Sequence, residues 1–123
     1  MNTHDYWCIH QIDIYCEEIM ASIRRFGNSY DVFLEDRDYY KSVSKSIEEI
    51  GELAKSFSSD YRKKTEGEIP WKNIIGMRDV FAHSYGNMDE YQIWKTATEN
   101  IPVLFDFCEK EIRKYRSQEG GTV

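Results

Sequence analysis

Apolar side chains recur every three or four positions along most of this sequence, which is the spacing that places them on one face of an α-helix. The spacing is most regular over residues 40–61, where it passes through Tyr40, Val43, Ile47, Ile50, Ala54, Phe57 and Tyr61. Such a seam predicts one long helix across this range. The polar stretch that follows, residues 62–68, is expected to be a loop.

Two other segments show the same spacing and are bounded by residues that stop a helix. The first helix is expected over residues 5–25, because Gly27 and Asn28 follow it. Another is expected to begin at Pro70, since proline fits the first helical turn, where its missing N–H would be unpaired in any case. It should end at the pair 86–87, Gly-Asn, which tolerates a left-handed backbone.

The last apolar segment opens with Asp89 and, three positions later, Gln92, a combination that resembles a capping box. Its apolar phase passes through Pro102 unbroken, which favours a kinked helix over two independent helices. After Arg116 the phase is lost, so residues 1–116 are interpreted as one helical domain and residues 117–123 as a disordered tail. With no strand predicted, the fold class is all-α, an up-and-down arrangement of four helices.

Composition excludes several classes of protein. A length of 123 residues suits a single domain, and 41% hydrophobic content argues against intrinsic disorder. Cys8, Cys16 and Cys108 show no C-x-x-C spacing, so neither a disulfide framework nor a zinc site is suggested, and Cys8 and Cys16 are expected to be buried free thiols. No apolar stretch approaches the ~20 residues that cross a bilayer, so no membrane contact and a cytoplasmic location are expected.

The distribution of charge leaves two readings open. A net charge of −6 argues against nucleic-acid binding, yet basic residues gather at helical spacing or in short runs, namely Arg37, Lys41 and Lys45, then 62–64, then Lys72 before Arg78. A solvated helix face explains each group equally well. Glu48, Glu49 and Glu52 could suggest a carboxylate metal site, but no matching Glu-x-x-His accompanies them, so no metal and no cofactor are expected.

The most informative stretch is residues 76–86, at the end of the third predicted helix. Arg78 and Tyr85 share one face, and Asp79 and His83 form an adjacent i,i+4 pair. Asp79 can accept a hydrogen bond from His83, and both this carboxylate and the negative helix end favour the imidazolium. Arg78 offers a planar, always charged fork that suits a phosphate.

Such a set can cleave RNA without a metal. The histidine would assist attack of the ribose 2′-hydroxyl on the adjacent phosphorus or protonate the leaving 5′-oxygen. Taken without further information, a purely structural Arg–His pair and an ordinary half-buried Tyr85 remain open.

The motif Arg78-x-x-x-x-His83-x-Tyr85 resembles the signature of HepT-like toxins of the HEPN superfamily. Other segments read like that family in the same order, and together they cover residues 5–116: 33–37, 50–55, 69–71, 74–78 and 94–102. The resemblance implies a four- to five-helix bundle that homodimerises, with both motifs facing one cleft. It also implies a metal-independent endoribonuclease that acts on RNA.

The same resemblance implies a partner, a minimal nucleotidyltransferase (MNT) antitoxin that transfers AMP from ATP to the signature tyrosine. Position by position, it makes Arg78 and His83 catalytic and Tyr85 the modified residue. Asp79 has a supporting role, although asparagine is more usual in the family at this position. Two alternatives stay open: a non-catalytic helical binding partner of a nucleotidyltransferase, and a purely structural interaction protein.

Overall fold

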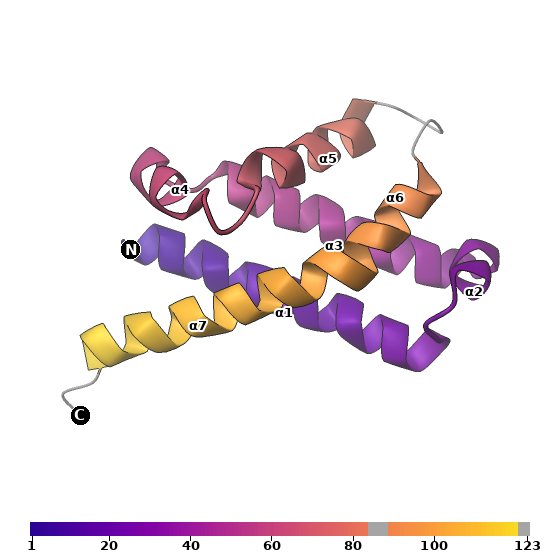
Figure 1. Cartoon of the computed structure of the whole chain (residues 1–123), viewed down its shortest axis with the longest axis horizontal. Helices are drawn as coiled ribbons and strands as arrows, with labels where there is room; N and C mark the ends of the chain where they lie inside the picture. Colours follow the sequence, from indigo (N-terminus) through magenta and orange to yellow (C-terminus); the bar gives the residue numbers. More distant parts are fainter. Residues whose placement is uncertain (84–88, 121–123) are drawn as a thin grey trace.

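The computed structural model describes the backbone of residues 1–83 and 89–120. Four long helical segments run alternately up and down: α1 (Thr3–Phe26), α3 (Arg37–Lys55), α5 (Trp71–His83), and a path made of α6 (Glu90–Lys95), η1 (Thr96–Asn100) and α7 (Ile101–Gly120) (Figure 1). The short helices α2 (Tyr30–Glu35) and α4 (Ser59–Thr65) lie in the connections. The described residues contain no strand, which confirms the all-α prediction.

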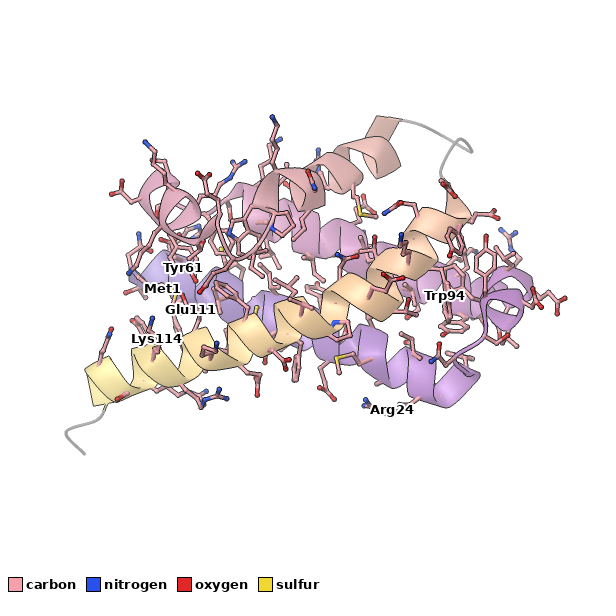
Figure 2. All side chains as sticks on the ribbon, in the orientation of Figure 1. Met1, Arg24, Tyr61, Trp94, Glu111 and Lys114 are labelled. Atoms are coloured by element: carbon pink, nitrogen blue, oxygen red, sulfur yellow. The ribbon has the colours of Figure 1, made fainter. Side chains whose placement is uncertain are left out.

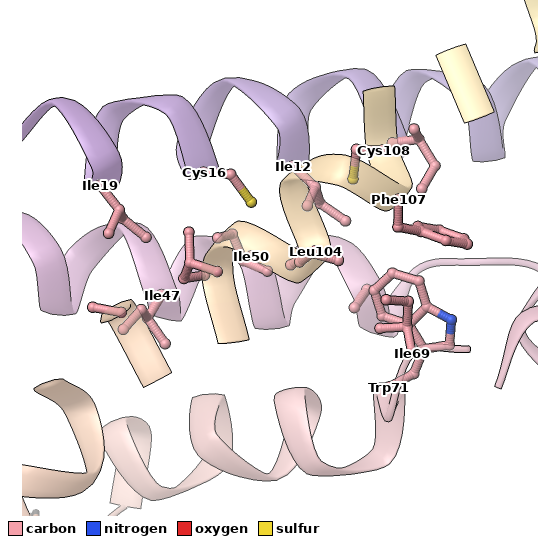
Figure 3. Packing of buried hydrophobic residues seen from close by; sticks show 14 of the residues in the cluster. Ile12, Cys16, Ile19, Ile47, Ile50, Ile69, Trp71, Leu104, Phe107 and Cys108 are labelled. Carbon is pink, nitrogen blue, oxygen red and sulfur yellow. The ribbon is translucent and has the colours of Figure 1, made fainter. Parts of the chain in front are cut away.

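The core lies between α1, α3 and α7. Helix α1 packs against both α3 and α7, whereas α5 packs mainly on the other side of α3. Figure 3 shows how these helices bring their apolar faces together, with the following residues labelled: Ile12, Cys16, Ile19, Ile47, Ile50, Leu104, Phe107 and Cys108. Of the described side chains of α5, only Trp71 is fully buried, and Ile74 to Arg78 are partly exposed. Helix α5 is therefore a peripheral helix that depends on α3.

The prediction of one helix over residues 40–61 is wrong, because α3 ends at Lys55 and α4 begins at Ser59. The cause is the buried carboxylate of Asp5, which accepts hydrogen bonds from the Ser58 N–H at 2.8 Å and the Ser58 hydroxyl at 2.6 Å. The Ser58 hydroxyl in turn accepts from the Tyr61 N–H and caps α4. The expected loop at 62–68 is accordingly helical as far as Thr65.

Helix α6 continues into α7 without a break, as the apolar phase through Pro102 predicted. The path bends through the π-helical turn η1, where the Ile101 N–H donates to the carbonyl oxygen of Thr96. A proline ring in a regular α-helix would clash with the carbonyl four residues earlier, here that of Thr98. The wider turn accommodates Pro102 just after it. The expected cap is also confirmed, because Asp89 accepts from the N–H groups of Tyr91 and Gln92.

The ends of several elements differ from expectation. Helix α2 was not predicted, and its start is capped by the Ser29 hydroxyl, which accepts from the Val32 N–H. Helix α7 extends to Gly120, so residues 117–120 are helical where a disordered tail was expected, and residues 121–123 lie outside the described part. All three cysteines are free and buried, as expected for Cys8 and Cys16. None of the described helices has the length and apolar character that crossing a membrane requires.

Candidate functional site

The start of α5 is fixed by a buried tryptophan. The Trp71 indole N–H donates to the Thr65 hydroxyl at 2.8 Å, and that hydroxyl donates to the carbonyl oxygen of Tyr61. Helix α4 is itself held to α7, because the Tyr61 hydroxyl donates to Glu111 at 2.6 Å, with both residues labelled in Figure 2. Burial raises the pKa of Tyr61, and the Glu111 carboxylate raises it further, so the hydroxyl stays protonated and remains a donor. The first turn of α5 is thus anchored to two other helices.

Along α5, the closest approach to α3 occurs at Gly51. A Cβ atom added to Gly51 would lie 2.4 Å from the Cβ of Arg78 and 3.1 Å from the carbonyl oxygen of Ile74. Real carbon atoms do not approach so closely without a shift of the helices. Gly51 therefore allows α5 to lie against α3 at the position of Arg78.

Arg78 forms an ion pair with the residue that follows this glycine. Its Nε lies 2.5 Å from Oε2 of Glu52, and the side chains are 25% and 54% exposed. The pair therefore lies at the surface of the α3–α5 contact, where solvent and a substrate can reach it. The contact is charge-assisted, which makes it shorter and stronger than a neutral hydrogen bond.

The other predicted site residues lie further along the same segment. The described part of α5 includes both residues, so the prediction that Arg78 and His83 share one helix is confirmed. The side chains of Asp79 and His83 lie outside the described part of the structure, as does all of Tyr85. The proposed Asp79–His83 hydrogen bond therefore stays a prediction.

Two of the three glutamates of α3, Glu49 and Glu52, form ion pairs with different residues. Glu49 pairs with Lys45 at 3.0 Å along the helix, while Glu52 reaches across to Arg78 on α5. Within the described ranges 1–78 and 89–118, no three His, Cys, Asp or Glu side chains are grouped to hold a metal ion.

A groove of about 810 Å³ runs between α5 and the α6–η1–α7 path. Its floor is formed by Ile47 and Ile50 of α3, and its walls are mostly apolar, with Ile74 and Met77 on one side and Val103 on the other. One polar contact crosses it, in which the Thr96 hydroxyl donates to the Met77 sulfur at 3.4 Å. Figure 1 shows that α5 and the α6–η1–α7 path diverge from each other.

Sequence reasoning did not find Gly51 and Glu52 as parts of the site, although a signal was present. A glycine inside a long helix costs ~1 kcal/mol relative to alanine, so it suggests a packing reason. The sequence groups Glu52 with Glu48 and Glu49 and gives no sign that its role differs from theirs. Glu52 differs from Glu48 and Glu49 only because α5 lies close enough for Arg78 to pair with it.

Comparison with known proteins identifies the family of this chain. The family model described as "Ribonuclease HepT-like" matches residues 12–111, a span that includes both Arg78 and His83. No solved structure matches the chain.

Several curated proteins are also similar. A protein of Caldanaerobacter subterraneus subsp. tengcongensis, named as a candidate RNase, is 32% identical over 104 residues, which is 85% of this chain and 87% of the relative. A "Probable ribonuclease HepT" of Thermococcus cleftensis is 37% identical over 66% of this chain and 73% of its own length. Another candidate RNase, from Methanocaldococcus jannaschii, is 32% identical over 86% of this chain and 88% of its own length. The chain therefore belongs to the HepT-like ribonuclease family of the HEPN type.

Proposed function

We propose that this chain is the toxin of a HepT/MNT-type toxin–antitoxin pair and acts as a metal-independent endoribonuclease. The observation that carries the proposal is the placement of Arg78 and His83 on one helix, α5, within the span that the family model matches. The Arg78 side chain forms an ion pair with Glu52 of α3 and remains partly exposed. Its guanidinium can therefore contact an RNA phosphate at the surface. A cationic group in such a place stabilises the charge that develops on phosphorus.

The proposed reaction needs only groups of the protein and of the RNA. The ribose 2′-oxygen attacks the adjacent phosphorus, its proton leaves, and the bond to the 5′-oxygen breaks as that oxygen gains a proton. The products are a 2′,3′-cyclic phosphate and a 5′-hydroxyl. His83 serves as a proton-transfer group, since a histidine titrates near neutral pH, and Arg78 binds the phosphate oxygens.

The test uses purified Arg78→Ala and His83→Ala. Each variant should lose RNA cleavage by about 10²–10⁴-fold, because each removes a group that acts in the transition state. Growth inhibition on expression should disappear in parallel. Circular dichroism should report an unchanged helical content, and EDTA should leave wild-type cleavage unaffected. Cleavage that EDTA stops and magnesium restores would contradict the metal-independent mechanism, whereas an active His83→Ala would contradict the site.

The proposed control is AMP transfer to Tyr85 by a cognate MNT-type nucleotidyltransferase. One AMP adds a bulky anion two positions beyond His83, where its charge opposes binding of the RNA backbone. Incubation with the nucleotidyltransferase, ATP and magnesium should add an AMP-sized mass and stop cleavage. Tyr85→Phe should stay toxic and gain no mass. An adduct that persists in Tyr85→Phe would show that another residue is modified.

The proposal includes a homodimer. The groove beside α5 exposes an apolar surface next to the helix that carries Arg78 and His83, and a second copy of the chain is its proposed occupant. Burial of this surface in a two-fold dimer would bring two copies of α5 to one cleft. An RNA strand could then contact both motifs.

A further inference from the structure

We infer that Glu52 of α3 is a positioning residue that sets the orientation of Arg78 for RNA cleavage, and that Gly51 makes this contact possible. The inference rests on the proposed function, because it assigns Arg78 to the scissile phosphate. Its starting point is the ion pair between Oε2 of Glu52 and Nε of Arg78.

The atom that Glu52 contacts is the one that joins the guanidinium to its aliphatic stem. An arginine side chain has several rotatable bonds and loses up to ~2 kcal/mol of rotamer entropy when it is fixed. A carboxylate at Nε fixes both the direction of the stem and the plane of the guanidinium. The orientation of the whole group is then set before RNA binds.

Glu52 is well suited to this task because its helix is firmly held. Its neighbours Ile50 and Ala54 are 1% and 0% exposed, so this part of α3 belongs to the core. Arg78, by contrast, lies on the peripheral helix α5, whose side chains from Ile74 to Arg78 are only partly buried. The ion pair therefore ties the catalytic arginine to the more rigid of the two helices.

Gly51 determines how near the two helices can be. It lies one position before Glu52, and a Cβ there would meet the Cβ of Arg78 at 2.4 Å. The absence of this one carbon lets α5 come close enough for a glutamate on α3 to reach Nε. Gly51 and Glu52 thus act together, one through backbone distance and the other through charge.

Glu52 is expected to affect RNA cleavage but not to favour RNA binding. A carboxylate that is 54% exposed repels the RNA backbone, so Glu52 does not favour binding of the substrate. Its benefit appears only in the transition state, where a pre-oriented guanidinium stabilises developing charge without reorganisation. Loss of Glu52 should accordingly lower kcat and leave KM unchanged or reduced.

The experiment measures kcat and KM of Glu52→Gln on a short RNA oligonucleotide. The change removes the charge and keeps the shape, and we expect kcat to fall by about 10–100-fold, the effect of a misplaced catalytic group. Glu49→Gln is the matched control, because it removes a carboxylate from the same helix and breaks the pair with Lys45. It should keep wild-type kcat. Both ion pairs are open to solvent and contribute little to stability, so both variants should unfold near the wild-type temperature.

Two further measurements separate the possible outcomes. In an Arg78→Ala background, Glu52→Gln should cause no additional loss in single-turnover cleavage, since the residue to be positioned is gone. The pH profile of Glu52→Gln should keep the shape of the wild-type profile. A vanished acid limb would overturn positioning and make Glu52 a proton-transfer group. A wild-type kcat in Glu52→Gln, with Arg78→Ala inactive, would refute this inference alone, whereas an active Arg78→Ala would refute the proposed function.

Discussion

At the scale of single residues, the contact between α1 and α7 holds a titrating carboxyl. Asp13 is half-buried, and among the described residues its Oδ1 has no hydrogen-bond partner. Burial, a hydrogen bond with Glu109, and repulsion from Glu109 and Glu17 together raise the pKa of Asp13 from 3.8 to about 7, with burial the largest cause. The native protein therefore binds a proton at this position over a pH range in which the unfolded chain has lost it.

The sign of the pH dependence follows from this shift. Because the native pKa exceeds the unfolded one, the stabilising contribution of protonated Asp13 is complete below pH 3.8 and is lost as the pH rises to about 7. Asp13→Asn stays neutral at every pH. It should raise the free energy of unfolding at pH 8 by on the order of 1 kcal/mol, less than the full shift implies because the carboxyl is partly solvated.

Urea unfolding at pH 4 and pH 8 measures this effect. The gain in Asp13→Asn should be present at pH 8 and small or absent at pH 4. The control is Glu18→Gln, an exposed carboxylate on the same helix, which should show no such pH dependence. Equal effects of Asp13→Asn at both values would mean that Asp13 is ionised in the native protein throughout.

At the scale of elements, the α3–α5 contact decides where the proposed catalytic helix lies. Its two fixed points are Trp71, buried at the start of α5, and Gly51, which faces Arg78. Between them the side chains of α5 are partly exposed. The position of α5 therefore depends on its packing against α3 and the core, in which Ile74, Ile75 and Met77 are partly buried.

Gly51→Ala should destabilise the protein by about 1–3 kcal/mol, because the added carbon overlaps Arg78 and forces the helices apart. It should also lower kcat, since the Glu52 carboxylate could no longer contact Nε of Arg78. Gly76→Ala is the matched control on α5, where an added Cβ meets nothing within 4 Å. That change should be neutral or stabilise by up to ~1 kcal/mol, as alanine favours a helix. Chemical denaturation of both variants compares them directly. A loss of stability in Gly76→Ala that matches that of Gly51→Ala would contradict the steric explanation.

At the scale of the whole molecule, the groove of about 810 Å³ between α5 and the α6–η1–α7 path is a concave surface lined mostly by apolar side chains. Val103 lies on its wall and is 59% exposed, which is unusual for an aliphatic side chain at such a place. Burial of apolar area is the main favourable term in association. We therefore propose this groove as the interface of the proposed homodimer.

Analytical ultracentrifugation at micromolar concentration should show a dimer for the wild type. Val103→Glu should shift it to monomer, because a buried carboxylate without a partner is costly, while the fold of the monomer should persist since Val103 is exposed there. Trp7→Glu changes a comparably exposed residue on α1 and should leave the dimer intact. A monomeric wild type, or a dimer in Val103→Glu, would contradict this interface.

Local patterns along the chain predicted the buried faces of the long helices and the family. Periodic apolar residues such as Ile12, Cys16 and Ile19 specify a buried helical face, because helix geometry is local and repeats every 3.6 residues. The cap at Asp89 and the continuous helical path through Pro102 could be predicted because they too depend on local sequence. The Arg78–His83 spacing placed both residues on one helix without any knowledge of the fold.

Packing between elements produced the features that join distant parts of the chain. Asp5 breaks the seam at Ser58 through hydrogen bonds across 53 positions of sequence, and no local pattern at Ser58 announces such a partner. Glu52 differs from Glu49 only because α5 lies beside it. Periodicity states which face of a helix is buried, but not which helix covers it. Packing and charge between elements determine which helix covers a given face. In this protein they place Arg78 of α5 against Gly51 and Glu52 of α3.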